Sequence, residues 1–206
     1  MFEIFIKGGP IMWPLLATSV TAGAVTFERA FFIWKERRQR KPELVEKIFA
    51  AAERGQYEQA AAMGLESEDF VARTLAAGLA HRGISFSNAV LRAANRELKR
   101  FGRGLAVLDT TITLAPLLGL LGTVTGMIRA FGLLGGSELD APSAITGGIA
   151  EALIATAFGL GIAIVALLPF NYLNARLEEA RHEVEDAANR LELLLNRDTK
   201  DTRQVP

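Results

Sequence analysis

The stretch from Thr110 to Ile128 reads TTITLAPLLGLLGTVTGMI and contains no charged residue. A second uncharged stretch, ALIATAFGLGIAIVALLPFNYLNA, runs from Ala152 to Ala175. Because an α-helix rises about 1.5 Å per residue, each stretch is long enough to cross a hydrocarbon core of about 30 Å. The segment between them is short and rich in Gly and Ser, so the two helices must run antiparallel. The pair predicts a membrane-spanning helical hairpin.

Small residues lie on one face of each stretch, because they recur at spacings of three and four along the chain. A membrane provides no hydrophobic force between helices, so faces made of small residues pack closely against other protein. The glycines that we expect to pack helices together in this way are Gly119, Gly122, Gly126 and Gly159.

Each small face also carries one hydroxyl group, that of Thr123 on the first stretch and that of Thr156 on the second. By helical rise, both threonines lie about 10–12 Å below the outer end of the hairpin, which predicts a single polar layer. The alternative is that each hydroxyl bonds a carbonyl of its own helix, at Gly119 and at Ala152 respectively. These residues alone leave both arrangements open.

One carboxylate, that of Glu151, stands at the outer start of the second stretch. A carboxylate that enters a bilayer is costly and is by default a candidate for function. The alternative is that an acid in the first turn complements the dipole of its helix. The small faces carry no titratable residue at mid-membrane, so a carboxylate from a partner helix would have to carry a proton there. We expect the small faces to receive that partner helix.

A further uncharged stretch runs from Gly8 to Phe27, with Trp13 and Trp34 near its ends, where aromatic residues favour the membrane interface. Glu28 and Arg29 follow it, and we expect them to form a local pair or to snorkel to the interface. Lys and Arg flank the inner ends of all three stretches, whereas the hairpin loop has neither. The positive-inside rule therefore predicts three spans, with the N-terminus outside and the C-terminus in the cytoplasm.

The sequence thus predicts an all-α membrane protein of three transmembrane helices with long cytoplasmic helical extensions. The expected segments are a periplasmic amphipathic lead-in (1–10), the first span (11–34), a cytoplasmic helical segment (35–104), the second span (105–134), a periplasmic loop (135–148), the third span (149–175), a cytoplasmic helix (176–197) and a disordered tail (198–206). In the cytoplasmic segment, Pro42 begins a helix that Gly55 ends, and Ser67 caps a later one. An apolar stripe that includes Val184 and Leu191 needs a partner, either in the other cytoplasmic helices or in a neighbouring subunit.

Composition excludes several classes of function. The chain of 206 residues has zero net charge and no cysteine. Zero net charge gives no argument for nucleic-acid binding, and the lack of cysteine excludes disulfides, thiol catalysis and cysteine-ligated metals. The N-terminus lacks a basic region and a cleavage site, so we expect the first span to be retained. No nucleotide loop, HExxH motif or Ser/His/Asp arrangement is present, so we expect neither an enzyme nor a cofactor.

Two motifs give the sequence a resemblance to a known family. APLLGLLGTVTGMIRAF (115–131), followed by GGIAEALIATAFGLGIAI (147–164), closely resembles the MotA/TolQ/ExbB proton-channel family. The three-span arrangement is similar to the TolQ/ExbB branch. The resemblance implies a pentamer in the bacterial inner membrane around single-span partners similar to ExbD or TolR, each with an essential Asp in its span. By position in the motifs, Thr123, Thr156 and Glu151 match the ion-pathway residues of the family.

The function that this resemblance implies is that of a stator-like subunit that uses the proton-motive force to drive work in the cell envelope. That work would be TonB-type import or Tol-type envelope maintenance, through a TonB- or TolA-like protein. Two alternatives remain open. One is a non-conducting membrane scaffold whose small faces only pack subunits, and the other is a sodium-coupled motor of the same architecture.

Overall fold

The computed structural model describes residues 2–132 and 141–201, and within these ranges all regular secondary structure is helical. The chain divides into two compact units. The first unit comprises Met1–Arg29 and Gly104–Tyr172, and the second comprises Ala30–Arg103 and Leu173–Pro206. Two long helices, α2 (Met12–Gln39) and α8 (Ala141–Asp201), begin in the first unit and end in the second.

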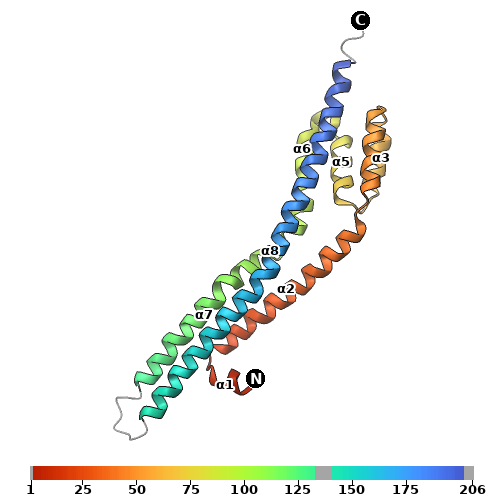
Figure 1. Cartoon of the computed structure of the whole chain (residues 1–206). Helices are drawn as coiled ribbons and strands as arrows, with labels where there is room; N and C mark the ends of the chain where they lie inside the picture. Colours follow the sequence, from red (N-terminus) through yellow and green to blue (C-terminus); the bar gives the residue numbers. More distant parts are fainter. Residues whose placement is uncertain (1, 133–140, 202–206) are drawn as a thin grey trace. The chain divides into compact units, whose positions relative to one another are not determined.

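The first unit contains α1 (Phe2–Lys7), the beginning of α2, the whole of α7 (Leu105–Gly132) and the beginning of α8. Within this unit, α7 and α8 run side by side in opposite directions, as the uncharged stretches predict (Figure 1). Their register is set by small residues, since Gly119 faces Thr156 and Gly159 while Gly126 faces Gly148. The hairpin is therefore held by direct contact between two backbones.

The start of α2 packs against both of these helices. Met12 and Leu15 of α2 are buried in one cluster with Ala115 of α7, and Ile154 of α8 packs against it. Ile11 faces Gly122, which lies well before the end of α7 at Gly132. The helical pair α7–α8 therefore continues beyond the point where α2 begins.

Two helices are long and apolar enough to cross a membrane, by length and composition: Leu105–Gly132 and the stretch Ile145–Arg197 within α8. Only 28% and 22% of their most apolar windows are buried within the chain, whereas the central helix of a soluble domain would be mostly covered. Their apolar side chains therefore face outward, as lipid or neighbouring protein requires. The segment predicted as the first span, within α2, does not reach the hydropathy that these two helices show.

Four short helices lie wholly within the second unit: α3 (Pro42–Glu53), α4 (Tyr57–Leu65), α5 (Phe70–Ala80) and α6 (Arg82–Phe101). Pro42 begins α3, and Gly55, with a φ of +73°, follows its end. The prediction of a Ser67 cap was wrong. Asp69 caps α5, because it directly precedes the first helical residue and its side chain accepts from the N–H groups of Val71 and Ala72.

The core of the second unit includes the apolar stripe of α8. Val184 and Leu191 are fully buried within this single chain, as are Ile48 of α3 and Leu75 of α5. The other helices of the same unit therefore cover much of the stripe. Helix α8 extends to Asp201, so it includes the first residues of the segment predicted as a disordered tail. Residues 202–206 of that tail, and residues 135–140 of the predicted periplasmic loop, lie outside the described residues.

Candidate functional site

The glycines predicted to pack helices all lie where α7 meets α8. A methyl group added to Gly119 would lie 3.0 Å from Cα of Thr156, and one added to Gly126 would lie 2.9 Å from the carbonyl oxygen of Gly148. A methyl group at Gly159 would lie 2.5 Å from the carbonyl oxygen of Ala115. Real Cβ atoms essentially never approach other atoms as closely as at Gly126 and Gly159, and the contact at Gly119 is tighter than most, so a side chain at these positions would push the helices apart.

This contact differs from one of our expectations. The sequence led us to expect that the small faces of the two spans receive a partner helix. In the structure these faces pack against each other, and Gly122 additionally faces Ala155 and Ile11. Two glycine faces permit the closest approach of two backbones, so little room remains for a third helix there.

Thr156 joins the two helices. Its hydroxyl donates a hydrogen bond to the carbonyl oxygen of Gly119 at 3.0 Å. A carbonyl oxygen has two lone pairs, so it can accept this bond in addition to its bond within the helix. The within-helix alternative, in which Thr156 would bond to Ala152, is not what the structure shows.

Thr123 does follow the within-helix alternative, although with a different acceptor. Its hydroxyl donates to the carbonyl oxygen of Leu120 at 2.7 Å. The residue is half-buried and lines a shallow hollow on α7 together with Val124, Met127 and Phe131. Thr123 and Thr156 therefore bond to different groups, and Thr123 borders the surface on the C-terminal half of α7.

Glu151 lies where three elements of the first unit meet. Its Oε1 atom accepts a hydrogen bond from Nη1 of Arg129 on α7 at 2.7 Å. Gly9, in the turn between α1 and α2, approaches the same carboxylate so closely that an added methyl group would overlap it. The sequence singled out Glu151 but gave no sign of these two contacts, because they join distant parts of the chain.

The local pair that we expected after the first uncharged stretch is present. Arg29 is buried and forms an ion pair with the neighbouring Glu28, whose side chain is exposed. A pair between adjacent residues neutralises the buried guanidinium, as its low-dielectric surroundings require.

A buried acid in the second unit, Glu36, was not predicted from the sequence. It is 4% exposed, and its Oε1 atom has no hydrogen-bond partner among the described residues. Burial raises the pKa of the Glu36 carboxyl above its usual value, although the positive charges of Arg100 and Arg73 act in the opposite direction. Glu36 lies within the charged run KERRQR, so the local sequence contains no signal that this acid is buried.

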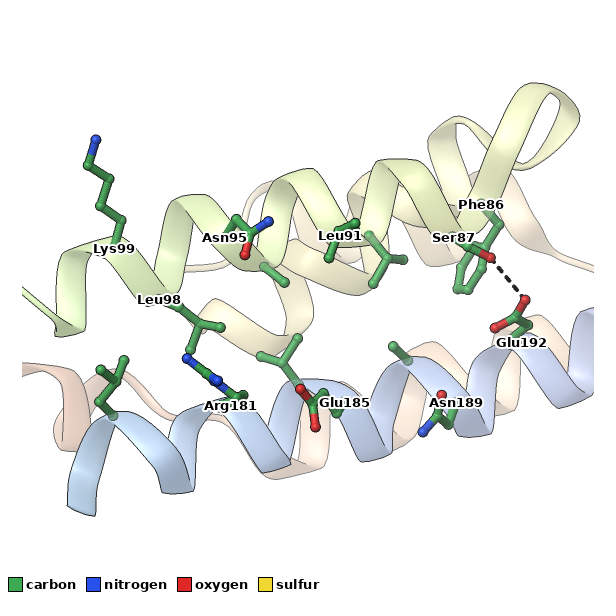
Figure 2. Close-up of a pocket in the computed structure, with 15 residues that line it drawn as sticks. Phe86, Ser87, Leu91, Asn95, Leu98, Lys99, Arg181, Glu185, Asn189 and Glu192 are labelled. Carbon is green, nitrogen blue, oxygen red and sulfur yellow. Dashed lines mark hydrogen bonds between the residues drawn. The ribbon is translucent and has the colours of Figure 1, made fainter. Parts of the chain in front are cut away.

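The second unit also contains a groove of about 720 Å³ between α6 and α8 (Figure 2). Its apolar part includes Leu91 and Leu98, and at one end Ser87 of α6 donates a hydrogen bond to Glu192 of α8 at 2.9 Å. No group of His, Asp and Glu side chains that could hold a metal ion occurs among the described residues. The groove is therefore a surface of mixed apolar and polar side chains.

The chain is similar in sequence to proteins of one known family. The model of a family described as the MotA/TolQ/ExbB proton channel family matches residues 66–186. The chain is 37% identical over 201 residues to a "Putative biopolymer transport protein ExbB-like 1" of Synechocystis, covering 94% of this chain and 78% of that protein. It is 32% identical over 197 residues to an "ExbB-like 3" protein of the same organism, covering 93% of each.

A shorter match is to a protein with a different name. The "Tol-Pal system protein TolQ" of Haemophilus influenzae is 35% identical over 105 residues, which covers 51% of this chain and 46% of that protein. The similarity therefore extends to proteins of both the ExbB and the TolQ type.

Proposed function

The chain belongs to the MotA/TolQ/ExbB proton channel family, in its TolQ/ExbB branch, and on this basis we propose that it is a subunit of a proton-driven motor in the bacterial inner membrane. Proteins of this branch are transport-associated membrane subunits and not enzymes, so no catalytic residue is assigned. The observation that carries the proposal is the α7–α8 hairpin. Glycines hold its two helices in close contact. The hairpin also carries the hydroxyl of Thr123 on an exposed apolar surface and the ion-paired acid Glu151.

The proposed topology has three spans, with the N-terminus outside and the C-terminus in the cytoplasm. Helix α2 supplies the first span, although its composition alone is not apolar enough to establish this. Two features support the assignment. Its start is buried against α7 and α8 through Met12 and Leu15, while Trp13, Val20 and Phe27 present large apolar side chains outward. One buried face and one exposed apolar face are what is expected of a helix that packs against protein on one side and lipid on the other.

In this proposal, several copies form a ring, with a pentamer as the expected number, around single-span partners similar to ExbD or TolR. Each partner helix would carry an Asp in its span. Because the glycine faces are filled within the chain, the partner would contact the hollow on α7 that Thr123 lines with Val124 and Met127. We therefore propose this hollow, instead of the small faces, as the surface that contacts the partner helix.

The three polar residues then have separate roles. Thr123 offers its hydroxyl to the partner's Asp, and Thr156 holds the hairpin together beside it through Gly119. Glu151 acts at the periplasmic mouth, where ions would enter. A charge that crosses the membrane gains about 2.3 kcal/mol per 100 mV, which is enough to drive a conformational step. The work done would be TonB-type import or Tol-type envelope maintenance, through a TonB- or TolA-like protein.

One observation favours a second candidate function. The hydrogen bond between Thr156 and Gly119 uses one of the two candidate hydroxyls for packing. A non-conducting scaffold would have the same glycine contacts and the same bond, and would need no partner carboxylate.

The test is to purify the chain with a single-span protein that has one Asp in its span, and to measure proton flux in liposomes. Flux that requires both proteins and is lost in the partner's Asp→Asn variant is expected for the motor. A stable complex without flux would favour the scaffold.

A matched pair of variants of the chain then tests the partner-facing surface. Thr123 and Thr125 both donate to carbonyl oxygens of α7 itself, but only Thr123 lines the hollow. Thr123→Val should stop flux, whereas Thr125→Val should leave it near the wild-type level. Equal fluxes from the two variants would contradict the role given to Thr123.

A further inference from the structure

The turn between α1 and α2 is built around Gly9, and the geometry requires a glycine there for two separate reasons. Its φ of +72° lies in the left-handed region that other L-residues rarely adopt. In addition, a methyl group at Gly9 would overlap Oε1 of Glu151. The second reason is independent of the first, because Gly55 has a φ of +73° and nothing within 4 Å of an added methyl group.

The contact between Gly9 and Glu151 is a packing contact and involves no hydrogen bond from the backbone of Gly9. The N–H group of Gly9 donates to the carbonyl oxygen of Ile6 at 3.2 Å, and its carbonyl oxygen accepts from the N–H group of Met12 at 3.1 Å. Both backbone groups of Gly9 are thus engaged within the turn. The turn therefore forms a wall against which the carboxylate of Glu151 rests.

Arg129 provides the positive charge that pairs with the same carboxylate. Their side chains are 2.7 Å apart at Nη1 and Oε1, with that of Glu151 20% exposed and that of Arg129 50% exposed. The arginine is thus the outer partner of the pair. This pairing also accounts for a basic residue near the outer end of a span, where the positive-inside rule disfavours one.

We propose that Arg129 and Gly9 are positioning residues that fix the carboxylate of Glu151 at the outer end of the α7–α8 pair. Arg129 fixes its direction through the ion pair, and the Gly9 turn limits how far it can move. This inference rests on the proposed function, in which Glu151 acts at the periplasmic mouth. Neither residue touches the ion in this account, and both act through Glu151.

The first test does not depend on ion flux. The thermal unfolding midpoint, Tm, is measured for the purified wild-type chain, for Arg129→Gln, for Glu151→Gln and for the double variant. Each single change should lower Tm by about 2–4 °C, and the double variant by clearly less than the sum, because the pair is already lost. Losses that add would show that the two side chains are not coupled, and would overturn the assignment of Arg129.

The second test separates contact from backbone strain at Gly9. Gly9→Ala and Gly55→Ala impose the same unfavourable φ, but only the first places a methyl group against Glu151. Gly9→Ala should lower Tm more, and adding Glu151→Ala should remove the difference. Equal losses from Gly9→Ala and Gly55→Ala would overturn the assignment of Gly9.

The third test uses the complex with its single-span partner in liposomes. Arg129→Gln should reduce proton flux about tenfold by misplacing the carboxylate, whereas Arg129→Lys, which keeps the charge, should retain most of it. Wild-type flux in Arg129→Gln would overturn the positioning role. An absence of flux in the wild-type complex would instead contradict the proposed function, and the coupling measured by Tm would then decide the inference alone.

Discussion

The hydroxyl of Thr156 on α8 donates a hydrogen bond across the hairpin to the carbonyl oxygen of Gly119 on α7. Glycine at position 119 makes this possible, because any side chain there would meet the backbone of Thr156. Thr123 looks like its counterpart in the sequence but bonds within α7 to Leu120. Thr156 therefore joins two helices, whereas Thr123 borders an exposed surface of one.

The first prediction concerns this interhelical bond. Thr156→Val keeps the shape of the side chain but removes the hydroxyl, so the stability of the hairpin should fall by about 0.6–1.7 kcal/mol. Thr156→Ser keeps the hydroxyl and should lose less. Thermal unfolding of the purified chain measures both changes. If the motor proposal holds, Thr156→Val should also abolish proton flux while the complex still assembles, and full flux in this variant would contradict its role beside the pathway.

The second prediction uses two glycines of the same helix. Gly159 packs against Ala115 and Gly119, whereas Gly161 has nothing within 4 Å of an added methyl group. Gly159→Leu should therefore separate α7 from α8 and cost about 1–3 kcal/mol or more, while Gly161→Leu should be nearly neutral within a single chain. Tm and yield of folded protein in detergent report the difference. Similar losses from both variants would argue against the observed register of the hairpin.

The third prediction concerns the cap of α5. Asp69 is 0% exposed and accepts from the N–H groups of Val71, Ala72 and Lys41, besides pairing with Arg40. Asp69→Ala would leave these three donors without their acceptor and would remove one of the two ion pairs of Arg40, the other being with Glu183, so we expect a loss of about 3–5 kcal/mol.

Ser67 provides the control for this cap. Its side chain accepts a single hydrogen bond, from the N–H group of Asp69 at 3.1 Å. Ser67→Ala should therefore cost only about 0.5–1.5 kcal/mol in chemical or thermal unfolding. A larger loss from Ser67→Ala than from Asp69→Ala would return the cap to the position that the sequence suggested.

The fourth prediction is a dependence of stability on pH. Burial raises the pKa of Glu36 above its usual value of 4.5. Between 4.5 and the higher pKa of the folded state, the folded chain binds more protons than the unfolded chain, so the free energy of unfolding falls as pH rises through this window. Above the folded-state pKa the free energy of unfolding has lost the whole contribution of this group, and below pH 4.5 it has lost none of it.

Glu36→Gln removes the titrating group and should remove this dependence. The variant should gain stability relative to the wild type as pH rises from about 4 to neutral, with the gain levelling off above the folded-state pKa. Urea unfolding over this pH range measures the difference. A constant difference between the two proteins at all pH values would contradict the burial of an ionisable carboxyl at this position.

Several features could be predicted from the sequence because they depend on neighbouring residues. The hairpin follows from two uncharged stretches that are each long enough to span a bilayer. Pro42 and Gly55 mark the ends of α3 because each restricts or permits particular backbone angles locally. The pair of Glu28 and Arg29 forms between adjacent residues. None of these requires knowledge of which helices meet.

The tertiary structure decided what the small faces and the polar side chains contact. Periodicity shows that a face is small but not which other face covers it, and in this chain the two glycine faces cover each other. The burial of Glu36 likewise depends on helices that are distant in the sequence. The same holds for Glu151, whose contacts with Arg129 and Gly9 arise only when α7, α8 and the N-terminal turn come together. The sequence by itself determined the helices and their apolar faces through local geometry and hydropathy, and the packing of distant segments determined the partner of each polar group.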